Sequence, residues 1–418
     1  MEPDEFGLIF SGSAVVDRDD TSGFFGGEPG LVAIYTNHDE ETEEQIQSIA
    51  YSTDRGRTWT KYSENPVILN PGIKDFRDPK VIWHEETQRW VLALAAGDRA
   101  MFYSSQDLKN WTELSEFGAE DGAHGGVWEC PELFRLPVDG DPDDQKWVLL
   151  ISVNPGAPEG GSGSQYFVGD FDGTTFSNDN PPETELWADY GKDFYAAQAW
   201  SDVPDGRRLW IGWMNNWEYS KEIPTDPWAG SMSLPREVTL TNVPGEGVRL
   251  VQTPVAELAS LRTPVLELAD TSVSSDGSNA LSDLSGKTLE LLAEFEPGTA
   301  REFGFRVRKG EEAEQETAVG YDAENAQLFV DRSDAGPADF GEGFPGRHEA
   351  PMKPVDGRVR MRIFVDHASV EVFGNDGVAA ITDQIFPNPE SEGLELYAEG
   401  GEARLVSLEA YDSEATQG

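Results

Sequence analysis

The sequence has a single cysteine, Cys130, among its 418 residues. A disulfide framework within the chain and a cysteine-based metal cluster are therefore excluded. Histidine is also scarce, and the five histidines are scattered without the spacing of metal ligands. We accordingly expect no metal and no other cofactor. No run approaches the roughly 18 apolar residues of a transmembrane helix, and no signal-peptide pattern is visible.

Basic residues are few. Lysine and arginine number 31 against 78 aspartate and glutamate, which gives a net charge of −47. This charge excludes nucleic acid and anionic membrane surfaces as partners, because both would be repelled. It also predicts a halophilic protein, since concentrated salt screens the self-repulsion. The 38% of hydrophobic residues are enough for a folded core.

A short pattern recurs in the first half of the chain. Tyr51-Ser-Thr-Asp-Arg-Gly-Arg-Thr-Trp59-Thr60 returns as Tyr103-Ser-Ser-Gln-Asp-Leu-Lys-Asn-Trp111-Thr112, and a looser third copy spans 166–176. Each copy predicts a hairpin with Asp or Gly in the turn. A further strand is expected before each hairpin, at 31–35, 90–94 and 147–151.

A segment of a different kind precedes each of these strands, at 10–17, 76–83 and 127–134, and a fourth such segment lies at 194–200. Repeating units of four strands are typical of a β-propeller, in which the first strand of each blade lines the central channel. The alternative is an irregular β-sandwich with fortuitous sequence echoes. We therefore expect an all-β fold whose residues 1–250 form the propeller, with about four blades present and the first blade largely missing.

The second half has no tryptophan beyond about residue 264 and shows alternating apolar and polar residues instead. This period of two predicts a C-terminal β-sandwich over 264–418, with a hairpin turn at 374–377. Strands are expected at 288–295, 302–307, 326–331, 359–366 and 369–373. Residues 251–263 are expected to hold a short linker helix.

Two of the expected innermost segments carry a carboxylate next to a proline: Asp78 in an Arg-Asp-Pro motif and Glu129 in a Trp-Glu-Cys-Pro motif. Arg77 should keep Asp78 ionised, and Trp128 and Cys130 should raise the pKa of Glu129. One charged and one protonated carboxyl group suit glycoside hydrolysis. The alternative for each acid is a solvated or capping residue at a strand end.

Six ordered motifs together resemble glycoside hydrolase family 32, which contains invertases, levanases and inulinases. They are Phe10-Ser-Gly-Ser-Ala-Val-Val-Asp17, Asp75-Phe-Arg-Asp-Pro-Lys80, Trp128-Glu-Cys-Pro131, Tyr166-Phe-Val-Gly-Asp170, Tyr190-Gly-Lys-Asp-Phe-Tyr-Ala196 and Gly212-Trp-Met-Asn-Asn-Trp217. The resemblance implies a five-bladed propeller followed by a β-sandwich. It implies release of terminal β-D-fructosyl units from levan, inulin or sucrose with retention of configuration.

The resemblance also implies roles for individual residues. Glu129 matches the family's acid/base, and Asp78 matches its transition-state stabiliser, which binds fructose hydroxyls. The other matches are expected to bind substrate: Phe10, Ser11, Arg77 and Trp217.

One departure from the family is clear. The family's nucleophile is an Asp in an Asn-Asp-Pro-Asn-Gly-type motif of the first blade, and residues 1–418 contain no such motif. We expect an N-terminally shortened enzyme that turns over poorly. The alternatives are a non-catalytic fructan-binding protein, and an inverting glycosidase in which Asp78 activates water opposite Glu129.

Overall fold

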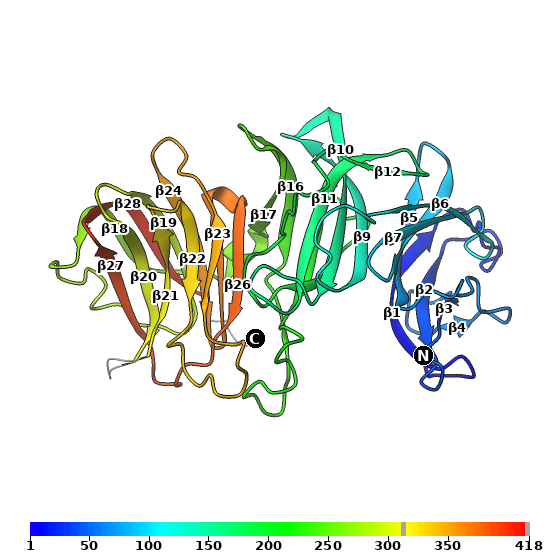
Figure 1. Cartoon of the computed structure of the whole chain (residues 1–418), viewed down its shortest axis with the longest axis horizontal. Helices are drawn as coiled ribbons and strands as arrows, with labels where there is room; N and C mark the ends of the chain where they lie inside the picture. The colour runs from blue at the N-terminus through cyan, green and yellow to red at the C-terminus, as the bar shows by residue number, and fades with distance from the viewer. Residues whose placement is uncertain (311–314, 414–418) are drawn as a thin grey trace. The chain divides into compact units, whose positions relative to one another are not determined.

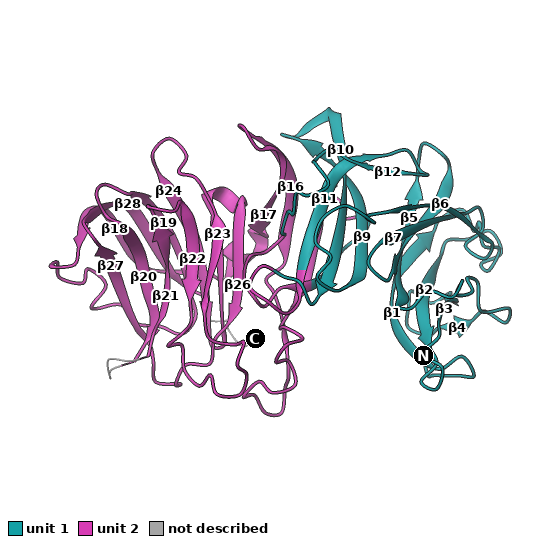
Figure 2. Ribbon diagram, viewed as in Figure 1, with its two compact units in different colours: residues 1–157, 164–187, 196–202 teal, residues 158–163, 188–195, 203–418 magenta. Residues whose placement is uncertain are grey.

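The computed structural model describes residues 1–310 and 315–413. The regular secondary structure of these residues is almost entirely β-strand, with two short 3₁₀ helices, η1 (Ala256–Leu261) and η2 (Asn375–Gly377) (Figure 1). Contacts divide the chain into two compact units, which Figure 2 distinguishes by colour. Unit 1 comprises residues 1–157, 164–187 and 196–202, and unit 2 comprises 158–163, 188–195 and 203–418.

Unit 1 is built from groups of four strands that follow one another in chain order. The first sheet has the order β1 (Leu8–Asp17), β2 (Gly30–His38), β3 (Gln45–Ser52), β4 (Thr60–Lys61). The second has the order β5 (Phe76–His84), β6 (Arg89–Ala96), β7 (Ala100–Ser105), β8 (Trp111–Phe117). The strands β9 (Val127–Val138), β10 (Asp141–Asn154), β11 (Gly163–Phe171) and β12 (Phe176–Asn178) are adjacent in the same way.

The strands expected from the repeat are confirmed. The four segments predicted as first strands fall on β1, β5, β9 and β13 (Tyr195–Ala199). The strands predicted to follow them fall on β2, β6 and β10. The three predicted hairpins are β3–β4, β7–β8 and β11–β12.

Side chains of the repeated pattern close its turns. Oδ1 of Asp54 accepts the backbone N–H of Thr58 at 2.8 Å, and Asp107, one position later in the second copy, accepts that of Asn110 at 2.8 Å. The indole N–H of the repeated tryptophan donates to a turn carbonyl in both copies, from Trp59 and from Trp111. The recurring residues are therefore those that satisfy the backbone of a tight turn.

Apolar side chains fill the space between neighbouring sheets of unit 1. One buried cluster joins strands of the first and second sheets and includes Ile34, Ile49, Phe76 and Leu92. A second cluster joins β6 and β7 to β9, β10 and β11, and includes Phe102, Trp128 and Phe167. Each sheet thus buries side chains against the next, which fixes the positions of the first strands.

Unit 2 contains the C-terminal strands. Strand β14 (Leu209–Met214) pairs with β15 (Ser231–Met232) and β16 (Arg236–Val243), and β16 pairs with β17 (Gly247–Pro254). A six-stranded sheet follows in the order β18 (Thr263–Ser274), β28 (Glu402–Asp412), β19 (Leu289–Glu296), β24 (Val359–Asp366), β25 (Ser369–Gly374), β26 (Ala379–Gln384). A five-stranded sheet has the order β23 (Arg347–Pro351), β22 (Gln327–Asp331), β21 (Thr317–Asp322), β20 (Glu302–Lys309), β27 (Gly393–Glu399).

The five strands predicted in the second half fall on β19, β20, β22, β24 and β25, and the predicted turn at 374–377 joins β25 to β26. The helix expected within 251–263 is only partly present. Residues 256–261 form η1, whereas residues 251–254 complete β17. The reason is the pairing of this segment with β16, which extends to Pro254 opposite Arg236.

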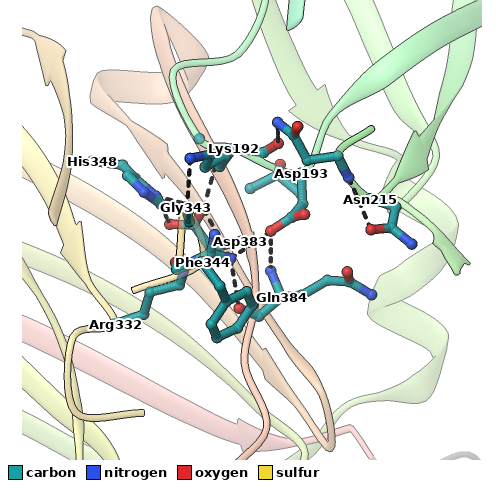
Figure 3. A network of polar contacts seen from close by, with 12 residues as sticks. Lys192, Asp193, Asn215, Arg332, Gly343, Phe344, His348, Asp383 and Gln384 are labelled. Atoms are coloured by element: carbon teal, nitrogen blue, oxygen red, sulfur yellow. Dashed lines mark hydrogen bonds and ion pairs between the residues drawn. The ribbon is translucent and has the colours of Figure 1, made fainter. Parts of the chain in front are cut away.

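A buried polar network ties residues 189–193 to β26 in unit 2 (Figure 3). Asp193 receives the backbone N–H of Gln384 at 2.8 Å and forms an ion pair of 2.5 Å with Arg332. Both ionic side chains are fully buried. On the same strand, Asp383 lies 2.7 Å from Nδ1 of His348. These contacts supply partners for an otherwise unpaired edge of the six-stranded sheet.

Candidate active site

The first strands of the three sheets in unit 1 share a β-bulge at equivalent places. In each of them two residues lie opposite one residue of the neighbouring strand: residues 10–11 on β1, 78–79 on β5 and 130–131 on β9. Asp78 and Cys130 have positive φ values of 64° and 47°. A bulge changes the direction of the side chains at the strand. The prolines at 79 and 131 tolerate this position, because it needs no ladder donor.

The predicted site residues Arg77, Asp78 and Glu129 come together around the Arg77 guanidinium. Nη2 of Arg77 lies 2.9 Å from Oε1 of Glu129, and Nε lies 4.0 Å from Oδ2 of Asp78. Nη1 forms a third ion pair with Asp75 at 2.6 Å. One arginine therefore links carboxylates from two neighbouring first strands.

Asp78 is held from three sides. Its Oδ2 accepts the backbone N–H of Cys130 at 2.9 Å, and the Cys130 thiol lies 3.6 Å from the same oxygen. Its own N–H donates to Oγ1 of Thr36 on β2. Asp78 is only 6% exposed.

Burial raises the pKa of Asp78 above its ordinary value of 3.8. The hydrogen bond from Cys130 and the charge of Arg77 act in the opposite direction but do not offset burial. Arg77 favours the ionised form of Asp78 as expected, but loss of hydration has the larger effect and raises the pKa.

The predicted apolar collar around Glu129 is wrong as well. Neighbouring residues on a strand point to opposite faces, and Trp128 is fully buried in the core, with its indole donating to the Ala123 carbonyl at 3.0 Å. The Glu129 carboxylate instead contacts Arg77. Cys130 contacts Asp78, and burial raises the pKa of its thiol well above the ordinary value.

Phe10 and Ser11 occupy the bulge of β1. The Phe10 ring is 38% exposed and stacks on the ring of His38, with centroids 4.5 Å apart and planes at 15°. His38 in turn contacts Gln45, which contacts Arg77. Phe10 is thus connected to the Arg77 group through two residues that sequence reasoning missed.

A second buried ion pair joins the same two strands. Nζ of Lys80 on β5 lies 2.7 Å from Oε2 of Glu132 on β9, with side-chain exposures of 7% and 0%. The same oxygen accepts the backbone N–H of Ala199 at 3.0 Å. Sequence reasoning missed this pair, although each residue directly follows the proline of a predicted site motif.

The remaining predicted binding residue, Trp217, belongs to unit 2. It is 48% exposed and packs on Trp213, with ring centroids 4.9 Å apart. Its backbone N–H donates to the Ser162 hydroxyl, and the neighbouring Asn216 amide donates to the carbonyl of Lys192 at 2.8 Å. The corner that carries Trp217 is therefore fixed by the same segment that enters the network in Figure 3.

Across residues 1–310 and 315–413, no group of three or more His, Cys, Asp or Glu side chains is arranged to hold a metal ion. Within the same residues, no helix has the length and apolar character needed to cross a membrane.

Comparison with protein families gives two matches. Residues 1–254 match the N-terminal domain of glycosyl hydrolases family 32, and residues 257–412 match the C-terminal domain of that family. Among curated proteins, the chain is 58% identical over 98% of its length to a levanase of Bacillus subtilis, and it spans 60% of that protein. It is 39% identical to an extracellular exo-inulinase of Aspergillus awamori over 98% of the chain and 81% of the relative.

Comparison with solved structures also gives matches. The crystal structure of the Aspergillus awamori exo-inulinase matches 97% of this chain and 84% of its own, with a TM-score of 0.91 at 38% identity. A β-fructofuranosidase from Schwanniomyces occidentalis, complexed with fructosyl-erythritol, matches with a TM-score of 0.86 at 32% identity over 97% of this chain and 83% of its own. The fold class predicted from sequence, a β-propeller followed by a β-sandwich, is confirmed, while the number of blades stays a prediction. The chain belongs to glycosyl hydrolase family 32.

Proposed function

We propose that the site around Arg77 binds a terminal β-D-fructosyl unit of a fructan or of sucrose and serves its hydrolysis with retention of configuration. The observation that carries the proposal is the ion pair of 2.9 Å between Arg77 and Glu129, with Asp78 beside the same guanidinium. The names of the relatives, levanase and exo-inulinase, support the substrate class.

Glu129 is the acid/base of this proposal. Its side chain is 18% exposed, so it can reach a ligand while Arg77 fixes its orientation. It protonates the leaving oxygen of the glycosidic bond and then activates the water that completes hydrolysis. Asp78 is the transition-state stabiliser and accepts hydrogen bonds from fructose hydroxyls.

The other proposed ligand contacts come from residues of mixed character. Arg77 donates hydrogen bonds to the sugar, and Ser11 supplies a hydroxyl beside it. Phe10 offers an exposed aromatic face, on which the apolar face of a sugar ring can stack. Trp217 on unit 2 also offers an exposed aromatic face, and we propose it as a substrate-binding residue by itself.

The proposal assigns no nucleophile, because residues 1–418 lack the motif that carries it in the family. We therefore expect strongly impaired turnover by this sequence and make ligand binding the primary measurement. Domain boundaries at 250 and 264 are part of the same proposal.

The test is calorimetric titration of the purified chain with levan oligosaccharides, inulin oligosaccharides and sucrose, combined with an assay of released fructose. Asp78→Asn and Arg77→Ala should each weaken binding by about tenfold or more, because each removes charge-assisted hydrogen bonds. Any fructose release should be lost in Glu129→Gln. The matched control is Glu113→Gln, an exposed residue on β8.

Two results would decide against the proposal. Absence of both binding and fructose release for all three ligands contradicts the substrate class. Ligand binding that Asp78→Asn and Arg77→Ala both leave unchanged contradicts the site around Arg77.

A further inference from the structure

We infer that His38 and Gln45 are positioning residues that link the exposed Phe10 ring to Arg77, and that only the neutral imidazole with its hydrogen on Nε2 completes this link. The inference rests on the proposed binding of a fructosyl unit at Phe10 and Arg77. It adds two residues and a pH dependence that the proposed function does not contain.

The first contact is between two rings. Phe10 lies almost parallel to His38, with an interplanar angle of 15° and centroids 4.5 Å apart. The imidazole covers one face of the Phe10 ring, while the residue as a whole stays 38% exposed. A flat aromatic face with rigid support suits stacking against a sugar. His38 therefore determines where that face lies.

The second contact fixes the chemical form of His38. Gln45, which is 4% exposed, lies with Nε2 3.4 Å from Nδ1 of His38 and with Oε1 3.3 Å from Nη1 of Arg77. A guanidinium only donates hydrogen bonds, so the amide oxygen must face Arg77. The amide nitrogen then faces His38 and donates to it. Nδ1 must consequently be unprotonated, which leaves the hydrogen on Nε2.

Protonation of His38 would break this arrangement. A hydrogen on Nδ1 would meet the amide NH₂ of Gln45, and turning the amide would place that NH₂ against Arg77. Neither orientation satisfies both neighbours. The charged groups around the imidazole are Asp39, whose pKa is lowered mainly by hydrogen bonds from the backbone of Thr42 and Glu41, and Arg77 beyond Gln45. Neither of them offers Gln45 an alternative acceptor within the link.

The link ends at the proposed acid/base. Arg77 forms ion pairs with Glu129 and Asp75, and Gln45 is a third partner of the same guanidinium. Without the Gln45 contact, Nη1 of Arg77 loses one of its hydrogen-bond partners, and the Phe10 ring is no longer linked to the carboxylates through Arg77. We therefore expect weaker fructosyl binding at acidic pH, beyond any effect of Asp78 itself.

The first experiment needs no ligand. Nitrogen-15 spectra of the imidazole side chains at about pH 7.5 should show an unprotonated Nδ1 and a protonated Nε2 for His38. In Gln45→Met the other neutral tautomer, with the hydrogen on Nδ1, should become detectable, because the population returns to the mixture of an unconstrained imidazole. A spectrum with the hydrogen on Nδ1 in the unmodified chain overturns the inference, whatever the ligand experiments give.

The second experiment compares dissociation constants for a levan oligosaccharide at about pH 7.5 and about pH 5.5, on either side of the ordinary titration range of histidine. His38→Phe keeps a ring under Phe10 but cannot titrate, so its binding should change less between the two pH values than that of the unmodified chain. His38→Ala should bind about threefold to tenfold more weakly at both pH values. His367→Phe replaces an exposed histidine on unit 2 and should behave like the unmodified chain.

Failure of this inference differs from failure of the proposed function. If the unmodified chain binds the oligosaccharide and all His38 variants bind it equally at both pH values, the positioning role is wrong and the proposed function stands. If the unmodified chain does not bind, both are wrong.

Discussion

The backbone N–H of Cys130 donates a hydrogen bond of 2.9 Å to Oδ2 of Asp78, and the two residues lie in the bulges of neighbouring first strands. Both have a positive φ, which costs of order 1–3 kcal/mol for a residue other than glycine. The amide N–H of Cys130 in the bulge of β9 therefore points toward the Asp78 carboxylate in the bulge of β5. Backbone strain on both strands is coupled to a single hydrogen bond at the proposed site.

Replacing Asp78 with asparagine should separate binding from stability. The variant keeps an oxygen for the Cys130 N–H but loses the charge, so fructosyl binding should fall by roughly tenfold to a hundredfold. The free energy of unfolding of Asp78→Asn, by contrast, should be higher relative to that of the unmodified chain near neutral pH. Because folding raises the pKa of Asp78, the protonated carboxyl group stabilises the fold below pH 3.8. This stabilisation is lost as the pH rises through the pKa that Asp78 has in the folded state.

The measurement is the free energy of unfolding of both proteins from about pH 3 to about pH 8. As the pH rises, the free energy of unfolding of Asp78→Asn should increase relative to that of the unmodified chain. Asp143→Asn, at an exposed position of β10, is the control and should show no such trend. A variant that loses stability progressively with rising pH would contradict the assigned direction of the pKa.

The strands were predictable because their signals are local. The Ser-Asp-Trp pattern closes a turn with its own side chains, so it marks a hairpin wherever it occurs. The alternation of apolar residues in 288–295 and 359–366 reports the face that β19 and β24 bury together. The same motifs placed Asp78 in the bulge of β5 and Glu129 directly before the bulge of β9.

The chemistry of the site was less predictable because it depends on neighbours that are distant in sequence. Burial by surrounding strands, and not the adjacent Arg77, decides the direction of the Asp78 pKa. Strand alternation sends Trp128 into the core, away from Glu129. Gln45 carries no local signal of its contact with Arg77, since that contact joins β3 to β5.

Breaking the Lys80–Glu132 ion pair from one side should be costly. Lys80→Met leaves the Glu132 carboxylate buried without its cation, and a loss of roughly 3–5 kcal/mol in unfolding free energy is expected. Lys80→Met combined with Glu132→Leu removes both charges, so the double variant should be more stable than Lys80→Met alone.

Denaturant unfolding of the two single variants and the double variant gives the coupling between the residues. The exposed pair Arg404 and Asp270 is the reference and should show little coupling. Additive losses for Lys80 and Glu132 would show that the two charges act independently.

The repeated turn should confer a specific acid sensitivity. Hydrogen bonds from the Thr58 backbone and hydroxyl, and then from Ser52, lower the pKa of Asp54 from 3.8 to about 2. A lowered pKa means that the contribution is present above pH 3.8 and is lost as the pH falls through about 2. Asp54→Ala should therefore destabilise the chain near neutral pH and lose this effect in strong acid.

Asp107 lies one position later in the second copy and also closes its turn, and its pKa is lowered as well. Asp107→Ala should consequently show the same pH trend in thermal unfolding, whereas Asp143→Ala should not. A pH-independent difference for both repeat variants would mean that the turns depend on side-chain packing rather than on the ionised carboxylates.

Salt should stabilise this protein through its net charge of −47. Screening reaches about 10 Å at 0.1 M salt and about 3 Å at 1 M, so repulsion between surface carboxylates fades over this range. The midpoint of thermal unfolding should rise steeply between about 0.1 M and about 2 M KCl, and equally in NaCl.

Replacing the exposed residues Glu40, Glu41, Glu43 and Glu44 with glutamine removes four of these charges and should reduce the slope of the midpoint against salt concentration. Trimethylamine N-oxide stabilises folded proteins by exclusion from their surface, so it should raise the midpoints of both proteins equally. Equal slopes in KCl for both proteins would show that the salt effect comes from apolar burial instead of charge.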